Sequence, residues 1–303
     1  MTDQENKAAK SGFVTIVGLP NAGKSTLLNS LVGQKIAITS KKPQTTRGAI
    51  RGILNEPEGQ IVFVDTPGVN KPADKLDDYM QSEVENSLKG IDAMLLVIDI
   101  RRKGPRADAL IERLKSTSVP LILVLNKVDS LSREKVFEAI NYYRLKADFA
   151  DIVPVSAKTG RNTDELVKVI FSHLPEGPAY YDEETITDQT ERKLVCEIIR
   201  EKALYSLNEE IPYGLAVVVD RMEYGRRLVK IDATIICERD SHKKILIGKG
   251  GDMLREIGSN ARYEIQKMLG RKVFLNLWVK VSKKWRESDY LLKDYGYDKS
   301  ARD

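Results

Sequence analysis

A glycine-rich loop near the start of the chain is the first stretch whose residue types and spacing indicate chemistry. "GLPNAGKST", residues 18–26, fits the pattern GxxxxGK[ST] between an apolar run and a helical stretch. Backbone N–H groups of such a loop surround a phosphate at the positive end of a helix, and the lysine bridges the β- and γ-phosphates. The loop predicts a nucleoside triphosphate site formed by Gly18, Asn21, Ala22, Gly23, Lys24, Ser25 and Thr26, with the Ser25 hydroxyl as a Mg²⁺ ligand.

"DTPG", residues 65–68, follows the apolar run 61–64. Asp65 is therefore expected at the carboxyl end of a strand, beside the phosphate loop, where it would hold a Mg²⁺-bound water. The Gly68 N–H would meet the γ-phosphate. We assign all four residues of this motif, Asp65, Thr66, Pro67 and Gly68, to the nucleotide site.

Two later motifs indicate which base is bound. "NKVD", residues 126–129, ends another apolar run, and the Asp129 carboxylate can accept hydrogen bonds from both N1–H and the 2-amino group of guanine. Adenine offers no such pair of donors. "SAK", residues 156–158, would place the Ala157 N–H on the guanine oxygen. The sequence predicts guanine specificity, with the base site formed by Asn126, Lys127, Asp129, Ser156, Ala157 and Lys158.

The elements that position these motifs alternate along the first two thirds of the chain. Short Val/Ile/Leu-rich runs, separated by helical stretches, occur at 13–18, 61–65, 93–99, 121–126 and 151–157. Such runs are typical of parallel strands buried on both faces. We expect a flexible N-terminus over 1–11 and a doubly wound α/β GTPase domain over 12–174.

The pattern then breaks at 174–188, where prolines, a glycine and acidic residues indicate a linker, which we place at 175–189. Helical spacing at 191–207 and 252–269, with strand-like runs at 213–220, 227–238 and 273–281, predicts a small α+β domain. We place this second domain at 190–296, followed by a tail at 297–303.

A second glycine loop, "ILIGKGGDML" at 245–254, lies inside the second domain. It lacks the spacing and the Ser/Thr of a nucleotide loop, and Asp252 would repel a triphosphate. Its GxxG pattern suits a KH domain, which clamps a nucleic-acid backbone beside a groove for about four unpaired bases. A tight turn at a helix start is the alternative. The candidate RNA-contacting residues are Lys243, Lys244, Ile247, Gly248, Lys249, Gly250 and Gly251.

Charge supports a polyanionic partner for the second domain. The net charge is +5, yet residues 226–286 alone hold 16 Lys and Arg against 6 Asp and Glu. Basic residues gain affinity for nucleic acids by releasing counterions, whereas the alternative is an ordinary soluble surface. "LWVKVSKKWRES", residues 277–288, adds aromatics among cations; Trp278 would be accessible, either to stack bases or to pack on a core strand, and Trp285 would be packed.

Other classes of protein fit the sequence poorly. No apolar stretch approaches the roughly 20 residues that a membrane helix needs. The polar N-terminus has no secretory pattern, so we expect a cytoplasmic protein. Cys196 and Cys237 are too few for a disulfide framework or a zinc site, and we interpret both as small buried hydrophobes.

On the motifs of its first domain the chain resembles the translation-factor-related class of P-loop GTPases. The double threonine of "KKPQTTRGAI", residues 41–50, implies that Thr46 joins Mg²⁺, with Thr45 as the rival. The resemblance gives Lys24, Thr46, Asp65 and Gly68 the catalytic roles. Val69 stands where Ras-like proteins have a water-orienting glutamine, which implies slow turnover. Related GTPases hold a potassium ion with an asparagine at the place of Asn21, which implies a potassium ion at Asn21 and potassium-stimulated turnover; a loop-stabilising amide is the alternative.

Across residues 12–296 the chain resembles the Era family of bacterial ribosome-assembly GTPases. "LNSLVGQKIAITSKKPQTTR", "EIIREK", "IPY", "KKILIGKGG" and "LWVKV" carry this likeness. It implies a type II-like KH domain that binds single-stranded RNA near the 3′ end of 16S rRNA, and a role in 30S subunit maturation. Peripheral association with the inner membrane and a monomeric state are further expectations. A GTP-dependent RNA-modifying enzyme and a membrane-associated signalling GTPase are the alternatives.

Overall fold

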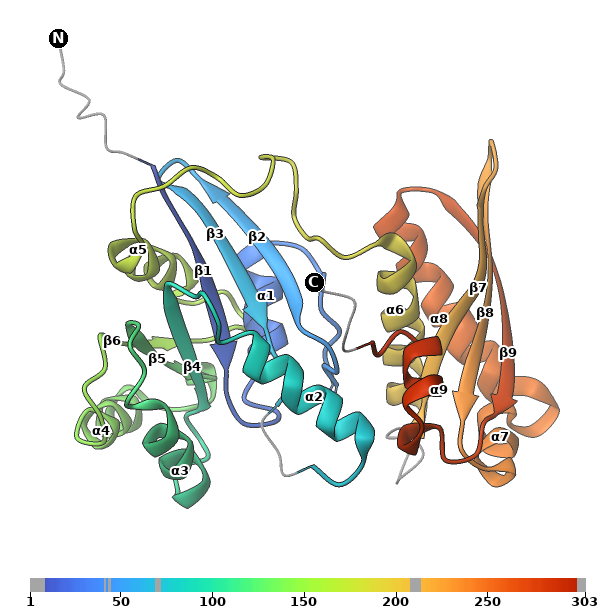
Figure 1. The fold of residues 1–303 in the computed structure, drawn as a ribbon, viewed down its shortest axis with the longest axis horizontal. Helices are drawn as coiled ribbons and strands as arrows, with labels where there is room; N and C mark the ends of the chain where they lie inside the picture. Colours follow the sequence, from blue (N-terminus) through green and yellow to red (C-terminus); the bar gives the residue numbers. More distant parts are fainter. Residues whose placement is uncertain (1–8, 41, 43–44, 69–71, 208–213, 299–303) are drawn as a thin grey trace, which may run out of the picture. The chain divides into compact units, whose positions relative to one another are not determined.

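A computed structural model describes residues 9–40, 42, 45–68, 72–207 and 214–298 of the 303-residue chain (Figure 1). The chain divides into two compact units that are not continuous in sequence. The first comprises residues 1–37, 46–70 and 83–188, and the second comprises 38–45, 71–82 and 189–303.

The first unit contains a six-stranded sheet in the order β2-β3-β1-β4-β5-β6. Neighbouring strands are parallel except β2, which runs antiparallel to β3. The strand bounds are Lys10–Val17 for β1, Ile50–Glu56 for β2, Gly59–Asp65 for β3, Ala93–Asp99 for β4, Leu121–Asn126 for β5 and Asp151–Val155 for β6. The carboxyl ends of the parallel strands therefore share one edge, where the sequence motifs follow.

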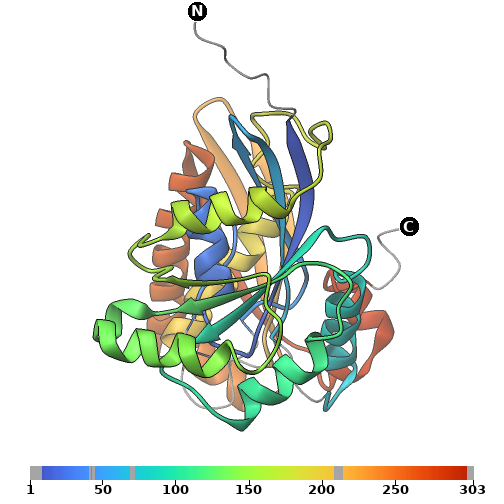
Figure 2. The same ribbon diagram turned by 90° about the vertical axis from the view of Figure 1, so that its left-hand side faces the viewer.

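Helices cover both faces of this sheet (Figures 1 and 2). Leu95 and Val97 of β4 pack in one core cluster with α1 and α5, whereas Leu96 and Ile98 pack in the other with α3 and α4. Burial on both faces explains why β4 is apolar at consecutive positions. The helices of the first unit are α1 (Lys24–Val32), α3 (Pro105–Leu114), α4 (Arg133–Tyr143) and α5 (Thr163–His173), with the short 3₁₀ helix η1 (Val128–Ser130), whereas residues 75–82 of α2 (Lys75–Asn86) belong to the second unit.

The second unit is built on a three-stranded sheet in the order β7-β8-β9. β7 and β8 are antiparallel, and β8 and β9 are parallel. One face packs on α6 and α8 (Figure 1) through residues such as Ile199, Ile231, Ile257 and Ile265. The elements are α6 (Glu191–Ser206), β7 (Ala216–Tyr224), β8 (Leu228–Cys237), α7 (Asp240–Ile247), η3 (Lys249–Gly251), α8 (Asp252–Leu269), β9 (Lys272–Val281), η4 (Trp285–Glu287) and α9 (Asp289–Asp294).

The doubly wound fold and the KH-type second domain are confirmed, but two elements are missing from the sequence prediction. The antiparallel strand β2 has no continuous apolar run, because its sequence, IRGILNE, mixes polar and apolar residues; only three of its residues are buried. Helix α7 contains the "ILI" that precedes the glycine loop, so those residues end a helix. The order of elements in the second unit, β8-α7-loop-α8-β9, therefore places the glycine loop between two helices.

The expected domain boundaries also need correction. β1 begins at Lys10, inside the segment 1–11 that we expected to be flexible, and Ser11 is buried. The expected linker packs on the first unit, since the Ile53 N–H donates to the Ile186 carbonyl over 2.8 Å. The expected tail at 297–303 begins in packed structure, because the Tyr297 ring stacks on Trp285. Thus backbone pairing and ring packing extend beyond the boundaries indicated by composition.

Candidate functional site

The phosphate loop joins β1 to α1 and requires glycine at two close approaches. A Cβ on Gly18 would lie 2.4 Å from the Val97 carbonyl oxygen. Gly23 has a left-handed φ of 100°, and a Cβ there would lie 2.3 Å from the Asn126 side-chain nitrogen. Only glycine allows both the conformation and the packing at this position. The loop that precedes α1 therefore has the backbone form that its sequence motif predicts.

The side chains of Ser25, Thr46 and Asp65 converge beside this loop. Ser25 Oγ lies 2.6 Å from Asp65 Oδ2 and 2.8 Å from Thr46 Oγ1. Asp65 is fully buried, and its Oδ1 has no hydrogen-bond partner within the described residues. Hydroxyl and carboxylate oxygens are ligands that Mg²⁺ prefers. An orphaned carboxylate oxygen in a cluster of this composition fits a magnesium site.

Lys24 and Asp65 are both buried charged groups in this cluster. Burial lowers the pKa of Lys24, whereas the nearby Asp65 charge opposes that effect. Burial likewise raises the pKa of Asp65, opposed by Lys24 and by hydrogen bonds from Ser25 and Thr46. The Lys24 ammonium donates to the Gly18 carbonyl over 3.2 Å. Its position inside the loop suits a lysine that exchanges this carbonyl for phosphate oxygens.

Thr45 and Thr46 lie in different surroundings although they are consecutive. The Thr45 hydroxyl donates to the Lys42 carbonyl over 2.7 Å, and Thr45 belongs to the second unit. Thr46 belongs to the first unit and has the contact with Ser25 described above. The geometry therefore favours Thr46 over Thr45 as the oxygen that joins a metal.

The turn after β3 lies against the phosphate loop. The Thr66 hydroxyl donates to the Ile16 carbonyl over 2.9 Å, which anchors the turn to β1. A Cβ on Gly68 would lie 2.9 Å from Pro20 Cγ, so the Gly68 backbone is close to the loop. Thr66, Pro67 and Gly68 therefore border the phosphate loop, and Val69 lies outside the described residues.

The buried side chain of Asn126 links the phosphate loop to the base motifs. Its Nδ2 donates to the Ala22 carbonyl over 2.9 Å. Its Oδ1 accepts from the N–H groups of Lys127, at 2.8 Å, and Ala157, at 3.0 Å. Three segments that are far apart in the sequence thus meet at one amide. This assembly places the "SAK" backbone beside "NKVD".

Asp129 lies at this assembly as an exposed carboxylate. Its Oδ1 accepts from the Ser156 hydroxyl over 2.6 Å, which leaves the other carboxylate oxygen able to accept from a base. Lys158, also in the "SAK" segment, is exposed. Hence the motif residues that we expected to recognise guanine are grouped at one end of the sheet.

Asp99, at the carboxyl end of β4, is a site residue that sequence reasoning missed. Its Oδ2 lies 2.9 Å from Lys127 Nζ, and Arg101 forms a bidentate pair with it at 2.9 Å and 2.8 Å. Burial raises the pKa of Asp99, but the hydrogen bonds from Arg101 and Lys127 outweigh burial and lower it to about 2. The available indication was its position, since an acid ends the apolar run 93–99.

Asn21 adopts a left-handed backbone with φ of 63°, a conformation in which asparagine is enriched. Its carbonyl accepts from Lys127 Nζ over 2.5 Å. The hydrogen bond from Lys127 therefore fixes the Asn21 backbone at the edge of the phosphate loop.

The second glycine loop, between α7 and α8, also depends on glycine geometry. Gly248, with φ of 75°, would place a Cβ 2.7 Å from Met253 Cβ. Gly250 and Gly251 also have positive φ, yet open space surrounds their Cβ positions. The exposed Lys249 lies among these glycines. A backbone this open allows close approach of another backbone, as a KH clamp requires.

The remaining RNA candidates lie on α7, directly before the loop. Lys244 is exposed, and Lys243 and Ile247 are half-buried. Arg255 pairs with Asp252 at 2.5 Å, which offsets the acidic group that directly follows the loop. Lys243, Lys244 and Lys249 therefore form a local group of cations at one end of the domain.

The two tryptophans differ as the sequence indicated. Trp278 on β9 is 50% exposed, whereas Trp285 is fully buried. The Trp285 indole N–H donates to the Gly214 carbonyl over 3.0 Å. Trp285 is thus a core residue, and Trp278 is available for contact.

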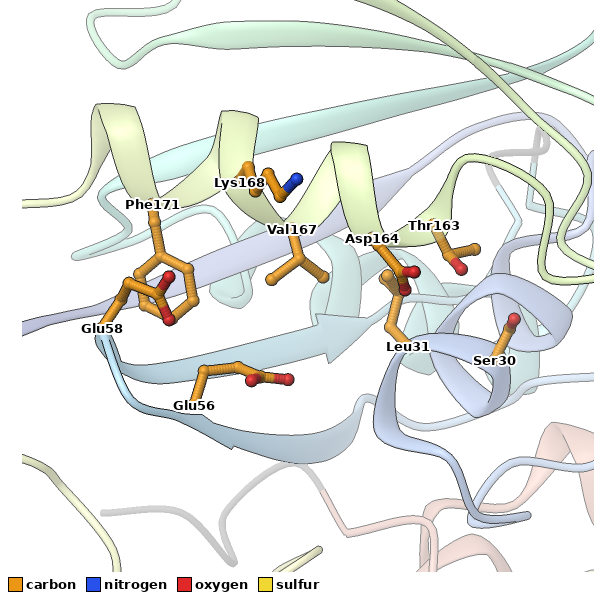
Figure 3. A pocket seen from close by; sticks show the side chains of 9 residues that line it. All are labelled: Ser30, Leu31, Glu56, Glu58, Thr163, Asp164, Val167, Lys168 and Phe171. Carbon is orange, nitrogen blue, oxygen red and sulfur yellow. The ribbon is translucent and has the colours of Figure 1, made fainter.

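A hollow in the first unit is distinct from the phosphate loop (Figure 3). Side chains of α1, α5 and the β2–β3 turn line it, among them Leu31, Phe171, Glu56 and Glu58. None of its lining residues belongs to the nucleotide motifs. Elsewhere in the described ranges no helix could cross a membrane, no group of three His, Cys, Asp or Glu could hold a metal, and both cysteines are free, Cys237 buried and Cys196 partly so.

Comparisons with known proteins agree with this geometry. A family described as 50S ribosome-binding GTPase matches residues 13–127, and the KH domain family matches residues 210–286. The fold and the two sites therefore define a P-loop GTPase that carries an RNA-binding KH domain.

Relatives that cover nearly the whole chain make the assignment more specific. GTPase Era of Clostridioides difficile is 48% identical over 95% of this chain and 99% of its own length. GTPase Era of Clostridium kluyveri is 49% identical over the same shares. A variant of Aquifex aeolicus Era bound to GDP and AlF4⁻ is 41% identical, with a TM-score of 0.92 over 95% of this chain and 99% of that one. The chain belongs to the GTPase Era family.

Proposed function

We propose that this chain is a GTP-driven switch that binds single-stranded 16S rRNA through its KH domain and assists maturation of the 30S subunit. One observation carries the proposal: an Era structure with MgGDPNP and nucleotides 1506–1542 of 16S rRNA matches 95% of this chain, with a TM-score of 0.92 and 41% identity. The chain has the corresponding nucleotide motifs and glycine loop, with the geometry given above.

Mg²⁺ is the cofactor that the first site would hold. Ser25 and Thr46 would bind it directly and Asp65 through water, because these oxygens already converge. When bound, the ion neutralises charge on the β- and γ-phosphates. The same Era structure contains magnesium with its nucleotide. Replacing Thr46 with alanine should lower single-turnover GTP hydrolysis about tenfold or more, whereas Thr45→Ala should change it little; the reverse order would assign the role to Thr45.

The protein groups act mainly by positioning the nucleotide. The loop N–H groups and Lys24 hold the phosphates, the Gly68 N–H reaches the γ-phosphate, and Asp129 selects guanine. Asn126 keeps the base and phosphate segments together. Because Val69 supplies no polar group to orient the attacking water, intrinsic turnover should be slow.

Potassium would add a second positive charge beside that of Lys24. We place the ion at Asn21, whose backbone is fixed at the loop rim by Lys127. Turnover should then be several-fold faster in potassium than in sodium, and Asn21→Ala should abolish the difference. Equal turnover in the two salts would exclude this role and leave Asn21 as a loop-stabilising residue.

The switch would act through residues 38–45, which directly precede Thr46 and belong to the second unit. Helix α6 holds this segment at several points. Glu201 accepts from the Thr39 N–H over 2.9 Å, and the buried Arg200 donates to the Thr45 carbonyl. A metal that binds Thr46 would therefore constrain a segment attached to the RNA-binding unit. Release of this constraint after hydrolysis would make the chain a two-state switch.

The KH clamp would hold unpaired RNA at Gly248–Gly251, with Lys243, Lys244 and Lys249 on its phosphates and Ile247 along the bases. Crosslinking to cellular RNA, with and without a non-hydrolysable GTP analogue, tests the proposal. GTP-dependent enrichment of 16S rRNA and of 30S precursors is expected. Enrichment of tRNA alone would favour an RNA-modifying enzyme, and absence of RNA would exclude the switch.

A monomeric chain in the cytoplasm, partly associated with the inner membrane, completes the proposal. The basic second domain supports weak attraction to anionic lipid. Cell fractionation should find most of the protein in the soluble fraction, with a salt-extractable remainder on membranes. A wholly membrane-bound protein without ribosomal association would instead favour the signalling GTPase.

A further inference from the structure

Strand β9, at one edge of the second sheet, carries a row of side chains that the proposed KH clamp does not use. Val273, Leu275, Leu277 and Val279 of β9 pack toward the helix-covered core. Because side chains alternate along a strand, the intervening residues lie on the opposite face. These are Lys272, Phe274, Asn276, Trp278 and Lys280, which we term the β9 stripe.

The β9 stripe alternates cations and aromatic rings in exposed positions. Phe274 is 53% exposed and Trp278 is 50% exposed. Lys272 and Lys280 are exposed and have no ion pair within the described part of the chain. Lys230, which pairs with Phe274 in the strand register, extends the positive charge onto β8. Aromatic rings between cations suit single-stranded nucleic acid, whose bases stack on the rings while its phosphates contact the cations.

Acidic groups on the same face are engaged with neighbours. Asp232 accepts from the Asn276 amide over 2.8 Å, and Asp220 accepts from the Thr234 hydroxyl over 2.7 Å. Glu223 pairs with Arg221 at 2.5 Å. These acidic residues keep their negative charge, but all three lie on β7 and β8. On β9, the charged residues of this face are Lys272 and Lys280. The positive charge is thus concentrated at the free edge of the sheet.

The C-terminal segment covers only one end of this face. Trp285 and Leu292 pack with Ala216 and Ile236, which lie near the start of β7 and the end of β8. Lys280 is opposite Ile236 in the register, so the stripe runs from this covered end toward the β7–β8 hairpin. Phe274 and Trp278 remain accessible, with a separation of about 13 Å expected from the strand rise.

We propose that the β9 stripe is a second platform for single-stranded RNA, on which Trp278 and Phe274 stack unpaired bases while Lys272 and Lys280 contact phosphates. The inference rests on the proposed RNA-binding function and extends it. A KH groove takes about four unpaired bases, so a longer strand must continue onto other protein surface. β9 offers that surface because it is an edge strand whose Phe274 and Trp278 are about half exposed.

Two unstructured RNAs of different length test the platform, one of about four nucleotides, which the KH groove accommodates, and one of about twelve. For the longer RNA, Trp278→Ala should raise Kd about tenfold, and the double variant with Phe274→Ala should raise it further. Affinity for the shorter RNA should not change. Trp278→Phe, which keeps a ring, should restore most of the lost affinity.

Fluorescence gives an independent readout, because the chain has two tryptophans and Trp285 is buried. Iodide should quench Trp278 selectively in the free protein. The longer RNA should protect it, whereas the shorter RNA should not. Tyr290→Ala is the matched control, since Tyr290 is 78% exposed and lies outside the stripe, on α9.

The possible failures are distinguishable. If the wild-type chain binds neither RNA, the proposed function itself fails. If both RNAs bind, but Trp278→Ala leaves affinity for the longer RNA unchanged and the longer RNA does not protect Trp278 of the wild-type chain from iodide, the platform is excluded while the KH clamp stands. Loss of a protein partner in the Trp278→Ala variant, with RNA affinity intact, would likewise overturn the proposal.

Discussion

At the scale of single residues, Asn126 has the most connected role in the nucleotide site. Its buried amide holds the phosphate loop through Ala22 and the base segment through Ala157. A buried amide whose nitrogen and oxygen are both hydrogen-bonded contributes more to a site than its own contacts suggest, because it fixes the backbones that present the ligand groups. The site is therefore preorganised by side-chain to backbone bonds.

Replacing Asp129 with asparagine should change the preferred base. The amide loses one acceptor and gains a donor, which suits the 2-oxo group of xanthine and repels the 2-amino group of guanine. GTP affinity should fall about a hundredfold or more, since two hydrogen bonds to a charged group are affected. Competition between GTP and XTP for a fluorescent nucleotide measures this change. The control Asp148→Asn, at an exposed aspartate outside the site, should leave the preference for GTP unchanged. An unchanged preference for GTP in Asp129→Asn would contradict the assignment.

Asp99 should make a pH-dependent contribution to stability. Its folded pKa of about 2 lies below the ordinary value of 3.8 for an aspartate, so the contribution is complete well above pH 4 and is lost as pH falls toward 2. The shift corresponds to about 2 kcal/mol at neutral pH. Asp99→Asn should therefore lower the free energy of unfolding by about that amount at pH 7, and by about half as much near pH 3.

Urea unfolding of the nucleotide-free chain at both pH values measures the effect of Asp99. The exposed Asp148→Asn variant should show no comparable loss. A difference between wild type and Asp99→Asn that is constant from neutral to acidic pH would show that packing, rather than charge, explains the effect.

At the scale of elements, the sequence predicts what local periodicity encodes. Strands β4 and β5 are buried on both faces, and their continuous apolar runs predict them. Strand β2 and helix α7 were missed for opposite reasons. β2 lies at the edge of the sheet, where Arg51 and Asn55 are half-buried and Glu56 is exposed, and α7 is a short helix whose "ILI" resembles a strand. Tertiary context decides such segments, because their intrinsic preference is weak.

The glycine loop between α7 and α8 provides a prediction at this scale. Lys249→Ala should weaken RNA binding and reduce the slope of log K against log salt by about one, since one phosphate contact is lost. Lys135→Ala, an exposed lysine on α4, should alter neither quantity. Fluorescence anisotropy titrations over a range of salt concentrations supply both values. An unchanged salt slope would remove Lys249 from the phosphate contacts.

At the scale of the whole molecule, the division of the chain could not be predicted from the sequence. Residues 38–45 and 71–82 belong to the second unit although they lie inside the first domain of the sequence. The contacts responsible are distant in sequence: Thr39 bonds to Glu201, and Leu76 packs in one cluster with Trp285. Composition and periodicity report local structure, so such pairings have no pattern of their own.

Motifs, in contrast, made most of the nucleotide site predictable. Asp65 and Asn126 end strands that periodicity identified, and Ser25 lies in the first turn of a helix; fold topology brings these ends together. Thr46 depended on a family likeness, because a polar loop has no periodic pattern. Asp99 was missed because its partner Lys127 comes from another strand end.

The central claim is that the nucleotide controls RNA binding, and equilibrium affinity tests it most directly. An RNA that carries nucleotides 1506–1542 of 16S rRNA, the segment bound by the Era relative, is the probe. Its Kd for the full chain should be about tenfold lower with Mg²⁺ and a non-hydrolysable GTP analogue than with GDP. Equal affinity in the two nucleotide states would contradict the account, because the chain would then bind RNA without a switch.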